Sequence, residues 1–345
     1  MSTLVRNAWY VGAWADELAP GQLLGRTVLG EPVLFYRSAT GKASALEDRC
    51  CHRGLPLHHG AVIGETVQCG YHGLVYDSSG ACVKVPGQER IPPAARVNAY
   101  PVVEQDHLLW IWMGAAEQAD PKAIVRHTWH DDPKWSWCKD RYLVNANYLL
   151  ISDNLMDLTH VGYVHTKTIG GTPEAHSKAE MKTTRSANGV KVSRWMLNSI
   201  PPPAYTQAVK FNKDRVDRWM EIEFFPASVV RIHTGATDAG TGAYEGRRDG
   251  GFGFMGLNAM TPETEHSTHY FWSGAHNFHV GVPAATDRLR NSLEVTFAED
   301  KVIVESQYAT LRANPDAPQV MIASDAGMVA ARKLIAEMIN KEKAA

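Results

Sequence analysis

Two short motifs place cysteine and histidine side chains within a few residues of each other. Cys50 and His52 belong to the first motif, Cys69 and His72 to the second, and the sixteen residues 53–68 separate them. Two cysteines on one iron and two neutral histidines on the other hold a Rieske-type [2Fe-2S] cluster, and the histidines raise its reduction potential above that of an all-cysteine cluster. The pattern therefore predicts an electron-transfer centre with these four residues as ligands.

A structural zinc site is the alternative for this ligand set, because two cysteines and two histidines also satisfy tetrahedral zinc. Zinc fingers usually pair Cys with Cys and His with His, whereas each motif here supplies one of each. The other three cysteines are Cys51, Cys82 and Cys138, and they have no comparable partners. Because the chain begins without a signal peptide, we expect reduced thiols and a cytoplasmic protein.

A second group of candidate ligands lies in the segment 147–165. If this segment is one helix, Asp153, Asp157 and His160 share a face. Two carboxylates and an imidazole on one face are costly to bury unless a metal ion or hydrogen-bond partners compensate them. This group of residues therefore indicates a second metal site.

The two histidines of this segment, His160 and His165, are five residues apart, which is about 140° on an ideal helix. Both can bind one ion only if the helix ends or widens between them, and Gly162 is where we expect that distortion. The alternative is a pair of histidines on a helix surface or at a helix end. The predicted redox cluster elsewhere in the chain favours the metal site.

A carboxylate from a later helix supplies the third candidate ligand. Asp300 lies on the apolar stripe of a predicted helix over 286–312, in line with Leu293, Phe297, Val304 and Tyr308. An ionised Asp on a core-facing stripe needs a partner or a metal. Glu299 lies about 100° away and is expected to be solvated. His160, His165 and Asp300 form the two-histidine, one-carboxylate set that suits mononuclear non-haem Fe(II) and leaves positions open for O2.

Length and charge limit the class of protein. The chain has 345 residues, enough for two domains, and a formal net charge of −2. This balanced charge predicts no nucleic-acid or membrane partner, and no apolar run approaches the roughly 20 residues that cross a bilayer.

The pattern of elements predicts two domains and an α+β fold. Residues 1–116 contain short alternating segments broken by Gly and Pro, which is typical of a small β domain. The polar stretch 117–123 is a plausible joint, and residues 117–345 combine a strand-rich middle with helical stretches at 145–165, 285–312 and 324–342.

The chain contains no convincing nucleotide-binding motif. Residues 251–256 match G-x-G-x-x-G, but the segment that follows is strand-like and contains proline, so we interpret these glycines as strand residues. Electrons must then come from a separate reductase.

One strand offers candidate substrate contacts. Arg231 and His233 share a face of the predicted strand 229–234 and are candidates for binding an aromatic acid, since a buried anion needs a cationic partner. A solvated strand face is the alternative.

Three blocks of sequence resemble the motifs of the oxygenase (alpha) component of Rieske non-haem iron oxygenases: RCCHRG at 49–54, QCGYHGLVYD at 68–77 and DNLMDLTHVGYVH at 153–165. The resemblance covers nearly the whole chain. The opening RNAWYV and the segment TGAYEGRR at 241–248 are similar to the branch that includes vanillate and dicamba O-demethylases and toluenesulfonate methyl-monooxygenase. Cys51 stands where most members of the family carry proline.

This resemblance implies a Rieske β-sandwich domain followed by a helix-grip catalytic domain, assembled as a ring-shaped homotrimer. Asp157 would link the mononuclear iron to the cluster of the next subunit through His72, and Asn154 would lie beside the iron. Asn258 and Asn291 correspond to positions in the substrate pocket. The implied reductase is NAD(P)H-dependent and carries flavin and a ferredoxin-type cluster.

The expected function is that of a terminal monooxygenase, which uses O2 to hydroxylate a methyl or methoxy group of an aromatic acid. A cis-dihydroxylating dioxygenase acting on the ring of an aromatic acid is an alternative that the same iron allows. A stand-alone Rieske electron carrier is a further alternative, but it predicts no second iron, and His160, His165 and Asp300 argue against it.

Overall fold

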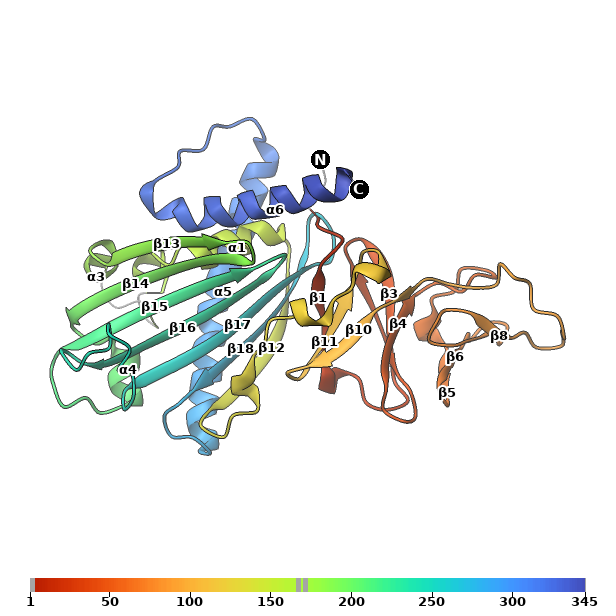
Figure 1. Cartoon of the computed structure of the whole chain (residues 1–345), viewed down its shortest axis with the longest axis horizontal. Coiled ribbons are helices and arrows are strands. Elements are labelled where there is room, and N and C mark those ends of the chain that lie inside the picture. Colours follow the sequence, from red (N-terminus) through yellow and green to blue (C-terminus); the bar gives the residue numbers. More distant parts are fainter. Residues whose placement is uncertain (1–3, 166–168, 170–172, 345) are drawn as a thin grey trace. The chain divides into compact units, whose positions relative to one another are not determined.

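The computed structural model describes residues 4–165, 169 and 173–344. The chain divides into two compact units. The first contains Met1–Arg126 and Thr261–Glu265, and the second contains His127–Met260 and His266–Ala345. Figure 1 shows their elements along the chain.

The first unit extends past the predicted boundary at 116. The segment after Gly114 returns to the strands of this unit, because Trp9 Nε1 donates to the Asp120 carbonyl oxygen at 2.9 Å. Arg126 then pairs with Asp106, with 2.9 Å between Nη2 and Oδ1. These contacts keep residues 117–126 with the β-rich unit.

Three antiparallel sheets make up the described part of the first unit, in the orders β1-β11-β10, β2-β3-β4-β9 and β5-β6-β7-β8. Their bounds are β1 (Trp9–Trp14), β2 (Leu23–Val28), β3 (Glu31–Arg37), β4 (Ala43–Glu47), β5 (Ala61–Ile63), β6 (Thr66–Gln68), β7 (Val75–Tyr76), β8 (Cys82–Lys84), β9 (Ala99–Tyr100), β10 (Val102–Gln105) and β11 (Leu108–Trp112). Short 3-10 turns occupy η1 (Ala15–Glu17), η2 (Leu57–His59), η3 (Ala116–Gln118) and η4 (Pro121–Ala123).

The second unit is built on an antiparallel sheet of seven described strands, in the order β12-β18-β17-β16-β15-β14-β13 (Figure 1). The strands are β12 (Ser136–Val144), β13 (Glu180–Ser186), β14 (Gly189–Ser199), β15 (Val216–Phe225), β16 (Val229–Asp238), β17 (Phe252–Pro262) and β18 (Thr268–His276). The helices and 3-10 turns are η5 (Thr128–His130), α1 (Tyr148–Met156), α2 (Val161–Val164), α3 (Pro173–Ser177), α4 (Pro203–Ala208), α5 (Pro283–Ala313), η6 (Ala323–Asp325) and α6 (Ala326–Ala344).

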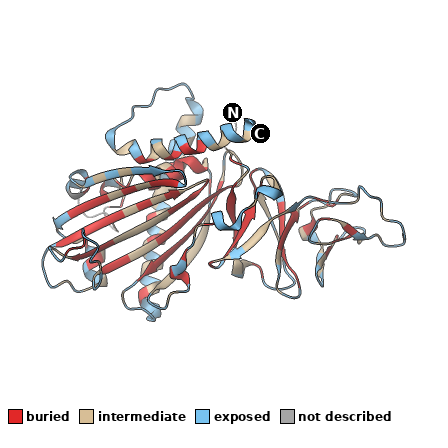
Figure 2. Cartoon of the chain, in the orientation of Figure 1, coloured by how far each residue is buried: buried red, intermediate tan, exposed pale blue. Residues whose placement is uncertain are grey.

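The long strands of this sheet carry most of the buried residues of the second unit, as the red segments of Figure 2 show. Helix α5 packs on β12 and β18, α1 lies against β15 and β16, and α6 packs on α1 and β14. The helical predictions near 285–312 and 324–342 are confirmed by α5 and α6.

The prediction of one helix over 145–165 is wrong, because the chain breaks at Asp157. Helix α1 begins after Asn147, whose side chain accepts a hydrogen bond from Leu149 N, and it ends at Met156. Asp157 is extended, with φ −123° and ψ 92°. Its carboxylate Oδ1 accepts a hydrogen bond from Thr159 N at 2.9 Å, a turn that competes with the helical ladder.

None of the helices in the described ranges combines the length and the apolar character that crossing a bilayer requires.

Candidate metal centres and substrate cavity

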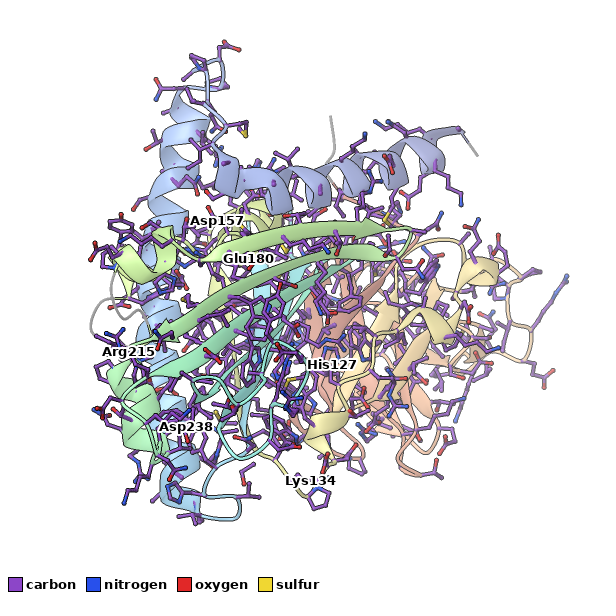
Figure 3. All side chains as sticks on the ribbon, turned by 60° about the vertical axis from the view of Figure 1, so that its left-hand side comes forward. His127, Lys134, Asp157, Glu180, Arg215 and Asp238 are labelled. Carbon is purple, nitrogen blue, oxygen red and sulfur yellow. The ribbon has the colours of Figure 1, made fainter. Side chains whose placement is uncertain are left out.

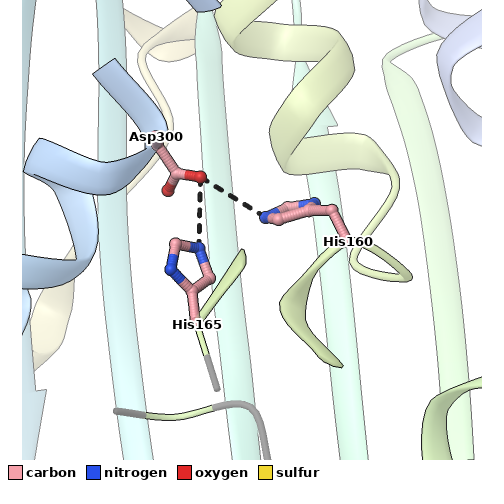
Figure 4. Close-up of side chains that lie close together, drawn as sticks. All are labelled: His160, His165 and Asp300. Atoms are coloured by element: carbon pink, nitrogen blue, oxygen red, sulfur yellow. Dashed lines mark ion pairs between the residues drawn. The ribbon is translucent and has the colours of Figure 1, made fainter. Parts of the chain in front are cut away.

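The structure brings His160, His165 and Asp300 together although Asp300 stands 135 positions after His165 in the chain. Asp300 Oδ1 lies 3.1 Å from His165 Nε2 and 3.5 Å from His160 Nε2, and one donor atom from each residue lies within 4.8 Å of the others. Figure 4 shows the three side chains converging from α5 and from the two ends of α2.

The break in the chain explains how both histidines reach one point. His160 is the N-cap of α2 and His165 is its C-cap, so neither is held on the face of a continuous helix. The expected distortion at Gly162 is not the cause, because Gly162 lies inside α2. A Cβ at that position would meet the Pro173 Cα at 2.9 Å, so the glycine allows α3 to approach closely.

Each histidine is oriented by a hydrogen bond from its second ring nitrogen. His160 Nδ1 lies 2.7 Å from the Asp157 carbonyl oxygen, which can only accept, so Nδ1 carries the proton. His165 Nδ1 donates to Glu299 Oε2 at 2.8 Å. Both Nε2 lone pairs are therefore available on the side of Asp300, which is the tautomer that a metal-binding histidine needs.

These contacts correct two predictions from the sequence. Glu299 was expected to be solvated, but it fixes His165. Asp153 and Asp157 were expected to share a helical face with His160, but Asp157 lies beyond the end of α1, where Figure 3 labels it. Asp153 instead forms an ion pair with Arg332.

The carboxylate of Asp157 keeps one oxygen without a hydrogen bond. Its backbone carbonyl, and not its carboxylate, binds His160, and its Oδ1 accepts from Thr159 N. Among the described residues no hydrogen bond reaches Oδ2. The negative charge of Asp157 acts on buried Arg194, whose pKa is lowered overall because burial outweighs this attraction.

Burial and charge act differently on the two histidines. Burial lowers the pKa of His160 and outweighs the attraction of Asp300. Burial also lowers the pKa of His165, but hydrogen bonds and charge from Asp300 and Glu299 outweigh it, so the net pKa is raised. Asn154 Nδ2 donates to Asp300 Oδ1 at 3.2 Å and helps to hold that carboxylate.

The donor set fits a mononuclear iron. Two imidazole nitrogens and one carboxylate oxygen converge from one side, with outer hydrogen bonds already made, and a polar group of this kind is costly in an apolar surrounding without an ion. Because only three protein donors converge among the described residues, coordination positions remain for other ligands.

Glu299 should therefore matter for iron loading although it is not a ligand. Glu299→Ala removes the acceptor that fixes His165, so we expect iron affinity to fall about 10- to 100-fold. Metal analysis after dialysis against graded chelator measures this loss. Asp287→Ala removes an exposed carboxylate from the same helix and should load iron like the unaltered protein. Equal iron retention in the two variants would contradict the role of Glu299.

The other candidate centre lies on two loops of the first unit with the same backbone pattern. Cys50 N donates to Leu55 O at 2.8 Å, and Gly54 N donates to Cys50 O at 2.9 Å. Cys69 N donates to Leu74 O at 2.8 Å, and its loop closes on Gly73. The glycines have φ of 75° and 72°, which a side chain would disfavour.

The four predicted cluster residues divide by burial. The thiols of Cys50 and Cys69 are each 2% exposed and interact with each other within an apolar core. His52 and His72 are exposed, and their ring centroids lie 4.6 Å apart. This arrangement fits a [2Fe-2S] cluster that is buried on its cysteine side and reaches the surface through its histidines.

Tyr76 is a cluster neighbour that the sequence reasoning missed. Its hydroxyl lies 3.2 Å from Cys50 Sγ and also 3.2 Å from Cys51 Sγ. The only sequence signal is its place seven residues after Cys69, because β7 returns it to the loops. A hydroxyl at this distance can donate a hydrogen bond to a cluster cysteine.

Removing that hydroxyl should lower the reduction potential. A donor to a cysteine sulfur stabilises the more negative reduced cluster, so Tyr76→Phe is expected to shift the potential down by about 60 mV, equivalent to about 1.4 kcal/mol for one electron. Redox titration of the visible spectrum measures it. Tyr36→Phe is the matched control, because Tyr36 belongs to the same core but its hydroxyl faces the Glu65 carbonyl oxygen at 3.4 Å. The same shift in both variants would contradict the assignment.

A cavity of about 240 Å³ in the second unit extends to the three converging residues. Its walls come from the sheet, α1, α4 and α5, and most of them are apolar. The aromatic part of the wall comprises Tyr205, Phe252, Phe254, Phe278 and Phe297. Tyr205 and Phe252 are stacked, with 3.8 Å between ring centroids.

The structure does not bring Arg231 and His233 to this cavity. On β16 it is Ile232 and Thr234 that line it, so the two candidates occupy the opposite face of the sheet. There Arg231 Nε donates to Glu223 Oε2 at 2.8 Å. His233 lies 3.4 Å from Glu221. Both side chains already have carboxylate partners, so the prediction that they bind a substrate is not retained.

The two asparagines differ. Asn258 is 2% exposed and lines the cavity, where its Oδ1 accepts from the Tyr270 hydroxyl at 2.6 Å and its Nδ2 donates to Val230 O at 3.3 Å. Asn291 is exposed on α5 and does not line the cavity. A pocket role for Asn291 is therefore not supported by its position.

Comparison with family models matches both parts of the chain. Residues 8–101 match the Rieske [2Fe-2S] domain, and residues 144–341 match the vanillate O-demethylase oxygenase C-terminal domain.

Curated relatives align over nearly the full length. The iron-sulfur subunit of the toluene-4-sulfonate monooxygenase system of Comamonas testosteroni is 41% identical, covering 98% of each chain. The vanillate O-demethylase oxygenase subunit of a Pseudomonas strain is 36% identical, covering 99% of this chain and 96% of the relative.

Solved structures give the same result. Dicamba monooxygenase bound to 3,6-dichlorosalicylic acid has a TM-score of 0.92 and 33% identity, with 100% of both chains covered. Dicamba monooxygenase with non-heme iron and dicamba has a TM-score of 0.85 and 31% identity, with 99% of both chains covered.

These findings confirm the α+β fold, with an N-terminal Rieske domain and a C-terminal catalytic domain, and the two cofactors, a Rieske [2Fe-2S] cluster and a mononuclear iron. The relatives are named as components of multi-protein systems, so a separate electron-transfer partner serves this enzyme. The chain belongs to the family of Rieske non-haem iron oxygenases and is the oxygenase component of a monooxygenase.

Proposed function

We propose that this oxygenase hydroxylates a methyl or methoxy group of a small aromatic acid, using O2 and electrons from an NAD(P)H-dependent reductase. The observation that carries the proposal is the apolar, aromatic-lined cavity that extends to His160, His165 and Asp300. An engineered apolar cavity of about 150 Å³ binds benzene, so about 240 Å³ accommodates one ring with substituents. The names of three relatives contain toluene-4-sulfonate, vanillate and dicamba, and all three compounds are aromatic anions.

His160, His165 and Asp300 would hold the mononuclear iron, and Cys50, His52, Cys69 and His72 would hold the cluster. The bound cofactors would supply O2 activation at the first site and single electrons at the second. For a methyl group, O2 and two electrons with two protons give the alcohol and water. For a methoxy group, the hydroxylated carbon leaves as formaldehyde.

The protein's own side chains prepare the reaction site. The hydrogen bonds from His160 Nδ1 to the Asp157 carbonyl and from His165 Nδ1 to Glu299 orient the rings so that, in the neutral form, Nε2 carries the lone pair. Asn154 restrains Asp300 through its 3.2 Å hydrogen bond. Apolar walls exclude water from the substrate carbon, which limits side reactions.

We extend the proposal to the path of the electrons. The Asp157 carboxylate, with its unbonded Oδ2, would accept a hydrogen bond from His72 of a neighbouring subunit in a homotrimer, as the family resemblance implies. The reductase would carry flavin and a ferredoxin-type cluster, and the system would be cytoplasmic.

Product analysis tests this function. The oxygenase is supplied with a surrogate reductase, NADH and a panel of methoxybenzoates, methylbenzenesulfonates and phthalates. A benzylic alcohol, or formaldehyde with the corresponding phenol, in amounts equal to the substrate consumed supports the proposal. A ring cis-diol as the main product would contradict it and indicate a dioxygenase.

A further inference from the structure

A buried arginine lies in the wall of the substrate cavity. Residues of β15 alternate, so that Arg218 and Met220 line the cavity while Trp219 and Glu221 belong to the opposite face. Arg218 is only 3% exposed. It therefore places a permanent positive charge on the apolar face of the sheet.

No carboxylate among the described residues pairs with the Arg218 guanidinium. Its guanidinium makes no hydrogen bond or ion pair with any described residue, and its Nε is enclosed without a partner. A buried cation without a counter-ion is costly, which indicates that another molecule supplies the negative charge.

The guanidinium is held in place by aromatic packing. Arg218 Cζ lies 4.9 Å from the centre of the Tyr205 ring, a cation–π distance. Tyr205 is in turn stacked on Phe252, and its hydroxyl lies 2.9 Å from Thr234 Oγ1. All these residues line the cavity. The cation is therefore positioned before any ligand arrives, which reduces the entropy lost on binding.

A second buried arginine, Arg194, interacts electrostatically with Arg218. Arg194 is 2% exposed; its pKa is lowered by burial, is raised by Asp157 and is lowered again by the charge of Arg218. Arg194 differs from Arg218 because its Nη2 donates to the His176 carbonyl oxygen at 2.6 Å and because Asp157 lies near it. Arg218 is thus the arginine whose charge is left for a ligand.

We infer that Arg218 binds the carboxylate or sulfonate of the aromatic substrate and thereby directs the other end of the ring to the three iron-binding residues. A planar guanidinium matches these oxyanions with two parallel hydrogen bonds. The inference rests on the proposed function, because it assigns the acid-binding residue of that same cavity. Arg218 is a specificity-determining residue and takes no part in the oxidation itself.

Another cavity-lining cation provides a competing assignment. Arg288 on α5 also borders the cavity, but it is exposed to solvent. A hydrated cation gains less from pairing with an anion than a desolvated one does. If Arg218 binds the acid, Arg218→Met weakens acid binding and Arg288→Met does not. If Arg288 binds the acid, the reverse holds.

Equilibrium binding to the holoenzyme, measured by calorimetry without reductant, tests the inference. The probes are three acids, 4-methylbenzenesulfonate, 4-methylbenzoate and 4-methoxybenzoate, each paired with its neutral amide. The unaltered protein should bind at least one acid about 10-fold or more tightly than its amide. Arg218→Met should weaken the binding of that acid at least about 30-fold, as expected when one partner of a buried charge pair is lost. The amides should change by less than about 3-fold.

Two further variants keep the test decisive. Arg218→Lys retains the charge but not the planar guanidinium, so the affinity for the acids should fall about 10-fold. This variant decides the question if Arg218→Met does not fold. Arg215→Met removes an exposed charge just before β15, labelled in Figure 3, and should leave all binding unchanged.

The outcomes separate this inference from the proposed function. Acid affinity that is unchanged in both Arg218 variants, or lost in Arg288→Met instead, overturns the inference, and so does an unaltered protein that prefers the amides. Hydroxylation of the acids by the unaltered protein would leave the proposed function standing in those cases. Selective loss of acid binding in Arg218→Met, without hydroxylation of any acid by the unaltered protein, would support the inference and reject the proposed function.

Discussion

Asp300→Ala is expected to abolish hydroxylation while the visible spectrum of the [2Fe-2S] cluster stays unchanged. Asp300 Oδ1 lies 3.1 Å from His165 Nε2 and 3.5 Å from His160 Nε2, so alanine removes the anionic member of the set. We expect a loss of at least about 4 kcal/mol of transition-state stabilisation, or about a thousandfold in rate. Turnover of an accepted acid and the absorption spectrum are measured on the same sample.

Asp287→Ala provides the control, since it removes an exposed carboxylate from the same helix and should retain full activity. The two centres belong to different family domains, residues 8–101 and 144–341. Loss of the mononuclear iron should therefore leave the cluster bound. A cluster spectrum lost in Asp300→Ala would show that the carboxylate is misassigned.

Asp157→Asn should slow electron delivery to the mononuclear iron at least about 100-fold, on the scale of losses from residues that support a metal site. Asparagine keeps an oxygen for the hydrogen bond from Thr159 N, and the His160 hydrogen bond uses the backbone carbonyl. Both local contacts therefore survive, and the substitution mainly removes the charge. The expected result is a protein with both centres loaded and a cluster that is still reduced.

Single-turnover oxidation of the pre-reduced, substrate-bound protein by O2 measures that rate. Thermal unfolding of the same variant serves as the control, because the substitution also withdraws the negative charge beside buried Arg194. A rate within a few-fold of the unaltered protein, with full iron occupancy, would eliminate the bridging role of Asp157.

Residue type and spacing were sufficient to predict the converging residues. Asp300 was found because a carboxylate stood on the apolar stripe of a long helix, and α5 confirms that helix. The cluster ligands of the Cys50 and Cys69 motifs could be predicted because each short loop carries one cysteine and one histidine close together in the sequence. In both cases the signal is local: one helix face, or one turn closed by a glycine.

The supporting contacts could not be predicted, because they depend on how separate elements pack. Glu299 was assigned to solvent from its angle on the helix, but His165 comes from another segment and reaches it. The end of α1 at Asp157 depends on a side-chain hydrogen bond that apolar periodicity does not show. Tyr76 reaches the cysteines only because β7 folds back.

The prediction of the substrate-binding residues placed them on the wrong face of strand β16. Arg231 and His233 are polar residues on an otherwise apolar strand, which is why the sequence predicts them, but Ile232 at the alternate position marks the cavity-facing side. On β15 the same rule identifies Arg218, which shares its phase with Met220. A polar residue in phase with the apolar residues of its element, as Asp300 is on α5, therefore also marks Arg218 on β15.

The most direct test of the two-centre account is a count of iron and acid-labile sulfide in the purified chain, together with the same count for Asp300→Ala. The account predicts about three irons and two sulfides per chain for the unaltered protein, and about two of each for the variant. Stoichiometric zinc without sulfide, or an Asp300→Ala protein that keeps its third iron, would contradict it.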